Sequence, residues 1–194
     1  MIFDPVAVME PQACDADMVR RTLAIMSLAS DDDIQFARDV DTDVARPFAD
    51  FIESEELPTL SWKQCRGIYA YADAFVEQLL LPAKYRFNVD RPFVVAERLG
   101  LEFPRPFTSS SATCPSYPSG HAGWATMIAH GLTWVLREQL SDAQRSGIFA
   151  IANRVALSRV QIGVHTLQDV AEGRRLAHAA ASANPPEHIP QVRV

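Results

Sequence analysis

Three separated groups of polar residues have types and spacings that could bind and transform a phosphate-like anion. In chain order they are Lys84 with Arg91-Pro92, Pro118-Ser-Gly-His121, and Ser158-Arg159 with His165 and Asp169. A transferring phosphoryl group spreads negative charge over its equatorial oxygens, so fixed cations and amide donors stabilise its transition state. The planar fork of an arginine suits these oxygens well. Brought together, the three groups predict a cationic pocket for a phosphate.

The middle group lies in a proline-stiffened loop, Cys114-Pro-Ser-Tyr-Pro-Ser-Gly-His121, which leads into a long apolar helix. Ser119 is a good N-cap for this helix, and Gly120 allows a ligand to approach the backbone. His121 falls in the first helical turn. The unpaired N–H groups there and the positive end of the helix dipole favour an anion. In the preceding loop, Phe107 and Tyr117 could either cover a substrate or anchor the loop.

Arg159 lies on the inward face of the expected helix 141–162, whose other inward residues are aliphatic, as Ile148 and Val155 are. A charge that faces the core is costly unless it is paired. Either a carboxylate or a bound anion must therefore meet Arg159.

The elements that must position these residues are predicted to be helices. Apolar spacing and capping patterns predict helices over residues 15–29, 30–51, 61–82, 119–136, 141–162 and 167–181, with Pro47 kinking or dividing the second. The periodicity fails over residues 83–92, which we interpret as a surface loop. We expect an all-α fold with a single helical domain over residues 1–183 and a loose tail over 184–194.

Composition excludes several classes of function. The chain has 194 residues, a net charge of -6 and a pI near 5.3, which argue against a nucleic-acid surface. No signal peptide or apolar run long enough to span a bilayer is evident. Cys14, Cys65 and Cys114 have neither metal-ligand spacing nor the pattern of a disulfide framework. We expect a soluble, cytoplasmic chain, or a periplasmic or secreted one if a leader was removed.

The three groups resemble, in order and spacing, the signature of the type 2 phosphatidic acid phosphatase (PAP2) superfamily. This superfamily contains bacterial acid phosphatases, lipid phosphatases and vanadium-dependent haloperoxidases. The resemblance covers roughly the second half of the chain and is strongest to the soluble acid-phosphatase and haloperoxidase branch. One departure is visible, because many members have Pro-Ser between the histidine and the aspartate, whereas this chain has Thr166-Leu-Gln168.

The resemblance implies a helical bundle of the PAP2 type and a role for each site residue. Lys84, Arg91, Ser119, Gly120 and Arg159 would bind the phosphate. His165 would be the nucleophile that forms a phosphohistidine, Asp169 would hold its other ring nitrogen, and His121 would protonate the leaving oxygen. The implied activity is hydrolysis of phosphate monoesters, with diphosphates as further substrates, and it requires neither a metal nor another cofactor.

Two alternatives remain open at the level of sequence. The same pocket could hold vanadate as the cofactor of a haloperoxidase, or it could bind phosphate without turnover. The expected partner in the leading hypothesis is a small phosphorylated molecule rather than a nucleic acid. An apolar strip on the first two helices leaves a homodimer open as well.

Overall fold

Helices make up all of the regular structure in the computed structural model, which describes residues 2–192 except for the side chain of residue 111. The all-α prediction is confirmed. In chain order the elements are α1 (Ala16–Met26), α2 (Asp31–Thr42), α3 (Arg46–Ser54), α4 (Trp62–Phe75), the π-helical η1 (Val76–Leu80), α5 (Leu81–Phe87), α6 (Pro92–Arg98), the 3-10 turn η2 (Ser110–Thr113), α7 (Gly120–Val135), α8 (Asp142–Gln161) and α9 (Leu167–Ala183).

Local sequence explains where several of these helices begin. Helices α2, α4, α8 and α9 each start with a capping box, in which the N-cap hydroxyl and the side chain three residues later satisfy free backbone N–H groups. Pro47 lies in the first turn of α3, where a missing N–H costs nothing, and it divides the predicted second helix into α2 and α3.

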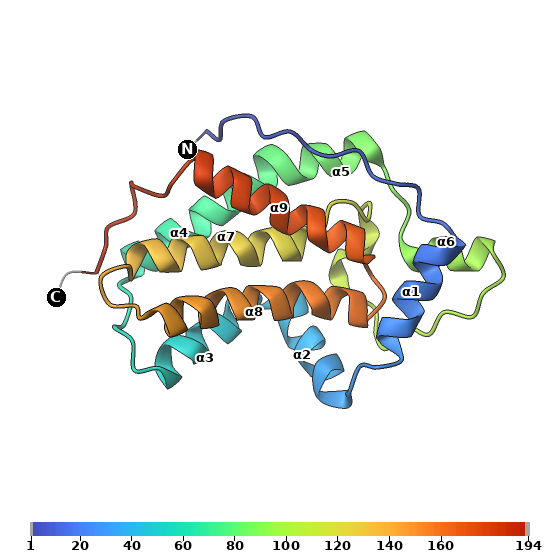
Figure 1. The fold of residues 1–194 in the computed structure, drawn as a ribbon, viewed down its shortest axis with the longest axis horizontal. Helices are drawn as coiled ribbons and strands as arrows, with labels where there is room; N and C mark the ends of the chain where they lie inside the picture. The colour runs from blue at the N-terminus through green and yellow to red at the C-terminus, as the bar shows by residue number, and fades with distance from the viewer. Residues whose placement is uncertain (1, 193–194) are drawn as a thin grey trace.

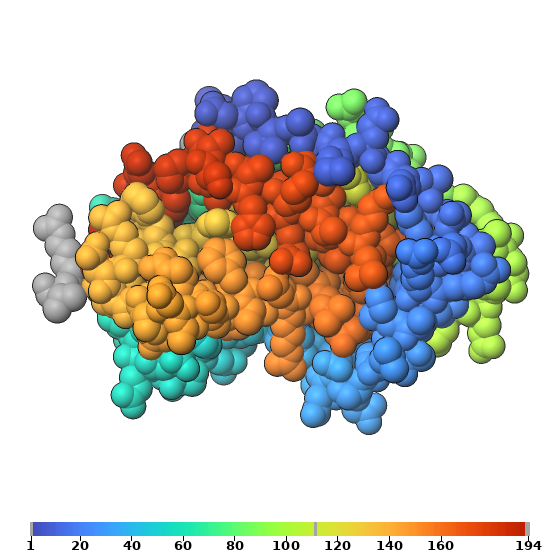
Figure 2. Space-filling view, in the orientation of Figure 1, coloured from blue at the N-terminus to red at the C-terminus, as the bar shows by residue number. Residues whose placement is uncertain are grey.

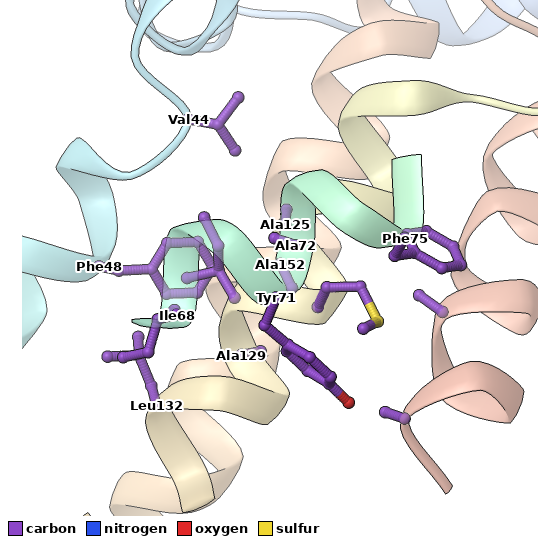
Figure 3. Packing of buried hydrophobic residues seen from close by; sticks show 14 of the residues in the cluster. Val44, Phe48, Ile68, Tyr71, Ala72, Phe75, Ala125, Ala129, Leu132 and Ala152 are labelled. Atoms are coloured by element: carbon purple, nitrogen blue, oxygen red, sulfur yellow. The ribbon is translucent and has the colours of Figure 1, made fainter. Parts of the chain in front are cut away.

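Helix α7 is the centre of the bundle (Figure 1). It packs most extensively against α8, α9 and α4, and most of its residues are buried on all sides. A helix that is apolar around its whole circumference belongs in the interior. Figure 3 shows Phe48 of α3, Ile68 and Phe75 of α4, and Leu132 of α7 among the side chains that fill the space between these helices.

The predicted surface loop over residues 83–92 is wrong in its first half. After α4 the chain passes through the π-helical η1 and continues as α5 to Phe87, so the helix does not end near Pro82. The shift in hydrogen-bond register places Pro82 in the first turn of α5, where its missing N–H is tolerated. As a result Lys84 faces the interior and is only 4% exposed.

The segment after α9 also differs from the loose tail that the sequence predicts. Ile189 is buried, and the backbone N–H of Val192 donates to the carbonyl oxygen of Val135 at 2.9 Å. This part of the tail therefore lies against the bundle. Its last two residues, 193–194, are outside the described residues.

The N-terminal segment crosses the bundle beside α9, as the blue and red surfaces in Figure 2 show. Glu172 of α9 accepts a hydrogen bond from the N–H of Met9 at 2.8 Å, and Arg175 donates to the carbonyl oxygen of Ala7 at 2.6 Å. Met9 also accepts a hydrogen bond from the hydroxyl of Tyr117 at 2.7 Å. The segment thus braces the loop that precedes α7. Among residues 2–192 no helix has the length and apolar character needed to cross a bilayer.

Candidate active site

A cavity of about 260 Å³ brings together residues from all three polar groups. Lys84 of α5, Arg91 at the start of α6, Gly120 and His121 at the start of α7, and His165 between α8 and α9 line it. The other three residues expected at the site, Ser119, Asp169 and Arg159, are buried behind this wall. The structure therefore assembles the predicted residues in two layers.

Two features at the junction of α8 and α9 position His165. Gly163 adopts a left-handed φ of 72° that ends α8, and the N–H of His165 then donates to the carbonyl oxygen of Arg159 at 3.2 Å. Thr166 is the N-cap of α9, and its N–H donates to the carboxylate of Asp169 at 2.8 Å. Threonine therefore provides the cap at the position where the sequence departs from the family pattern.

The carboxylate of Asp169 faces the Nδ1 atom of His165 at 3.4 Å. The hydroxyl of Ser116 lies between the two, donating to Asp169 at 2.6 Å and lying 3.4 Å from the same Nδ1 atom. Burial raises the pKa of Asp169, and hydrogen bonds from Ser116 and Thr166 together with the charge of Lys84 partly offset this effect. Ser116 is a site residue that the sequence analysis missed, although it lies within the polar loop singled out there.

The Nε2 atom of His165 is the nitrogen available for chemistry. The Nη1 atom of Arg91 lies 3.0 Å from it, and a guanidinium has hydrogens to donate but no lone pair to accept with. Nε2 must therefore be unprotonated, which leaves the proton of the neutral ring on Nδ1, facing Asp169. Burial, followed by the charges of Arg91, Lys84, Arg159 and His121, holds the pKa of His165 well below its usual value.

Carbonyl oxygens of the polar loop hold the cavity's cations in place. The ammonium of Lys84 donates to the carbonyl oxygens of Pro115 at 2.8 Å and Ser116 at 3.1 Å. Arg91 donates through Nε to the carbonyl oxygen of Cys114 at 3.0 Å. Burial and the charge of Arg91 lower the pKa of Lys84 to about 8. An anion that entered the cavity would offset the cost of burying the Lys84 charge and its repulsion by Arg91, and so would be bound strongly.

His121 lies in the first turn of α7, as predicted. Burial, followed by the charge of Arg159, lowers its pKa to about 4, while a contact of Nε2 with the carbonyl oxygen of Asp41 at 3.4 Å acts in the opposite direction. A carbonyl oxygen only accepts hydrogen bonds, so Nε2 carries the proton of the neutral ring and Nδ1 is free to take a second one.

A carboxylate meets the inward-facing Arg159, which is one of the two possibilities that the sequence left open. Asp41 of α2 lies 3.1 Å from its Nη2 atom and also accepts hydrogen bonds from the Ser109 hydroxyl at 2.5 Å and the Ser110 N–H at 2.9 Å. Burial alone would raise the pKa of Asp41, but these hydrogen bonds and the arginine's charge lower it. The Nε atom of Arg159 is buried, and it has no hydrogen-bond partner within residues 2–192.

Asp41 is a second residue that the sequence analysis missed. It comes four positions after Ala37, a buried residue of the inward stripe of α2, so an inward-facing carboxylate could have been matched with the inward-facing Arg159.

Tyr117 anchors the loop before α7 and does not cover the cavity. Tyr117 is 1% exposed and packs edge to face against Phe87, with ring centroids 5.8 Å apart. Phe107 packs against the small apolar cluster around Ile162 and contacts the guanidinium of Arg38 at 4.7 Å. Both aromatic residues therefore stabilise the loop, and neither lines the cavity.

Close contact between α7 and α9 fixes the second layer of the site. The N–H of Ser119 donates to the carbonyl oxygen of Asp169 at 2.9 Å, and the Ser119 hydroxyl caps α7 by accepting from the N–H of Ala122 at 3.4 Å. A Cβ atom at Gly173 would lie 2.4 Å from the carbonyl oxygen of Ser119. Only glycine allows the two backbones to come this close. The contact joins the start of α7, which carries His121, to the start of α9, which carries Asp169.

Comparison with known proteins agrees with this geometry. The family model described as "PAP2 superfamily" matches residues 67–183. Among solved structures, the crystal structure of LpxE from Aquifex aeolicus superposes with a TM-score of 0.62 at 20% sequence identity, covering 91% of this chain and 97% of that one. No curated protein matches the chain significantly.

The family match extends over more than half of the chain and contains Lys84, Arg91, His121, His165 and Asp169. The structural likeness independently supports the fold. The chain belongs to the PAP2 superfamily and is a phosphoric-ester hydrolase.

Proposed function

We propose that this enzyme hydrolyses phosphate monoesters through a phosphohistidine intermediate formed on Nε2 of His165. The observation that carries the proposal is the state of this nitrogen. It belongs to a histidine that lines the cavity, and it lies 3.0 Å from a guanidinium that can only donate hydrogen bonds, so we assign the proton of the neutral ring to the other nitrogen. A neutral imidazole with an available lone pair is a competent nucleophile.

Substrate binding makes this lone pair available. The Nη1 hydrogen that Arg91 directs at Nε2 is also a donor for a phosphate oxygen, so a phosphate in the cavity draws the guanidinium away from the ring. Lys84, which lines the cavity, is a further donor for the same oxygens, and Arg159, whose Nε is buried behind the wall, is the third cation of the proposal. Three protein cations thus provide the charge stabilisation that a metal ion provides in other phosphatases.

The reaction then proceeds in two displacements. Nε2 of His165 attacks phosphorus, the ester P–O bond breaks, and His121 gives its second proton to the leaving alcohol oxygen. Asp169 and the Ser116 hydroxyl stabilise the Nδ1–H of the positively charged phosphohistidine. Water, deprotonated by His121, next attacks phosphorus and breaks the P–N bond, which releases phosphate and restores both histidines.

His121 needs the substrate in order to hold its proton. In the free enzyme its pKa is about 4, so it is mostly neutral at pH 7. Two negative charges on a bound phosphate oppose the cations that lower this pKa and therefore raise it. We expect activity to be highest under mildly acidic conditions, where both the protonated His121 and the phosphate dianion are populated.

The test is phosphate release from a panel that includes p-nitrophenyl phosphate, with a chelator present throughout. The native protein should turn over, and His165→Ala should not. Brief incubation with radiolabelled substrate followed by alkaline quenching should leave label on the native protein alone, because phosphohistidine is stable in alkali and labile in acid.

Each outcome discriminates between the functions considered. Activity that chelator abolishes, or labelling that persists in His165→Ala, would contradict this mechanism. Halide oxidation that requires added vanadate and peroxide, without phosphate release, would instead identify the cavity as a haloperoxidase site. Binding of phosphate without any turnover would identify a binding module.

A further inference from the structure

The outer part of the cavity differs in chemistry from the phosphate-binding part. Its walls are the apolar side chains of Val44, Val76, Leu81 and Trp124, and one acidic residue, Asp73 of α4, lines it with them. These residues are not part of the polar groups that the sequence analysis identified. Asp73 is exposed and Trp124 is half-buried, whereas Lys84, Arg91 and His165 are buried, so this part of the lining is the one nearer to solvent.

An aromatic ring and a carboxylate lie side by side at this mouth. The indole N–H of Trp124 donates to the carboxylate of Asp73 at 2.8 Å. Trp124 comes three residues after His121 on α7, so the two side chains are neighbours on one helix face, about 5 to 6 Å apart at Cβ. A group attached two or three bonds beyond the leaving oxygen can therefore reach the indole face and the carboxylate.

The carboxylate of Asp73 is in none of the ion pairs found within residues 2–192. Burial first, and then the charges of Asp43, Cys65 and Asp73, raise the pKa of Tyr69, whose ring packs 5.8 Å from that of Trp124. The mouth is thus aromatic and negative, directly beside an inner part that is strongly positive.

We infer that the preferred substrates are phosphomonoesters whose alcohol portion carries an ammonium or quaternary ammonium group, which binds against Trp124 and Asp73. The inference rests on the proposed phosphatase function and specifies its substrate class. An aromatic face attracts a cation through the ring quadrupole, and an adjacent carboxylate adds a direct charge interaction. The same carboxylate repels esters that carry a second anionic group, such as diphosphates or phosphorylated carboxylic acids.

The experiment compares two esters of the same shape and different charge. Phosphocholine is paired with dimethylbutyl phosphate, in which carbon replaces the quaternary nitrogen, and kcat/KM is measured for both. A cation–π contact at a partly exposed site together with a screened ion pair gives an advantage of about 3- to 30-fold for phosphocholine. Raising the salt concentration should reduce this ratio, since exposed charges are screened.

Asp73→Asn tests the residue itself, because asparagine keeps an acceptor for the indole N–H and removes the charge. It should lower kcat/KM for phosphocholine by roughly 1.4- to 5-fold, the part of the advantage that the screened ion pair contributes, and change the value for the isostere by a smaller factor. Glu53→Gln is the matched control, since it removes one exposed negative charge of α3 that does not line the cavity. It should leave the ratio of the two esters unchanged.

The outcomes separate this inference from the proposed function. If both esters are hydrolysed equally well, or if Asp73→Asn lowers both values by the same factor, the ammonium subsite is refuted while the phosphatase function stands. If neither these esters nor p-nitrophenyl phosphate is hydrolysed, the proposed function itself is refuted, and the subsite with it.

Discussion

The buried pair between Asp41 and Arg159 offers the sharpest test of how the site is built. The substitution Asp41→Asn keeps an amide oxygen in place of the carboxylate oxygen and removes its charge. The two side chains are 7% and 0% exposed, so water cannot replace the lost charge. Arg159 is then a buried cation whose hydrogen-bond acceptors are both neutral, the asparagine oxygen and the carbonyl oxygen of Ala37 at 3.4 Å.

The expected cost follows from this burial. Removing one partner of a buried ion pair costs about 3 to 5 kcal/mol, and the acceptor that asparagine retains reduces this to roughly 2 to 3 kcal/mol. For a domain of this size each kcal/mol lowers the midpoint of thermal unfolding by about 2 to 4 °C, so the expected decrease is about 4 to 12 °C. Arg159 should also lose its orientation, which predicts a lower kcat/KM.

Urea unfolding of Asp41→Asn and of a matched control measures the effect. The control is Asp50→Asn, which breaks an ion pair of 2.7 Å with Arg46 whose side chains are 56% and 70% exposed. Its cost should be at most about 0.5 kcal/mol. Equal destabilisation by the two substitutions would refute the claim that Arg159 depends on Asp41 for its counterion.

A bound anion should replace the missing carboxylate. If a phosphate or vanadate in the cavity interacts with Arg159, as proposed above, it should stabilise Asp41→Asn by more than it stabilises the native protein. The double substitution Asp41→Asn with Arg159→Met removes both charges and should be less destabilised than Asp41→Asn alone. Additive costs and equal stabilisation by vanadate would both contradict the pairing.

Three further predictions concern other parts of the site. Ser116→Ala removes the 2.6 Å hydrogen bond to Asp169 and should lower kcat about tenfold. KM should change little, since the serine does not line the cavity. An unchanged kcat in steady-state assays would argue against this role. Gly173→Ala places a methyl group against Ser119 and should cost about 1 to 3 kcal/mol in thermal unfolding together with most of the activity, whereas full activity would show that the contact can relax. The pKa of His121, followed by NMR with His121→Ala for assignment, should be about 4 in the free enzyme and should rise on vanadate binding. This pKa is below the value in the unfolded chain, so between about pH 6.5 and pH 4 the unfolded chain binds a proton that the folded chain does not. His121 should therefore lower the free energy of unfolding by about 1.4 kcal/mol for each pH unit that the pH falls through this range. A smaller pH dependence of stability in the native protein than in His121→Ala would contradict this sign.

Local chemistry determined much of this protein. Hydrophobic spacing and the capping boxes at Ser30, Ser61 and Ser141 defined helices that the structure contains, because both signals act within a few residues. The order of cations and histidines along the chain was enough to predict an anion pocket. The inward position of Arg159 also required a negatively charged partner, although the sequence of the helix did not determine whether this partner is a carboxylate or a bound anion.

Tertiary structure decided the rest, because the remaining contacts join residues far apart in sequence. The sequence placed Lys84 in a surface loop, whereas the π-helical turn carries the helix past Pro82 and turns the lysine inward. Asp41 became the partner of Arg159 through the packing of α2 against α8, over a separation of 118 residues. The pKa values of His121 and His165 arise from burial among cations contributed by several helices, and burial is a property of the folded chain alone.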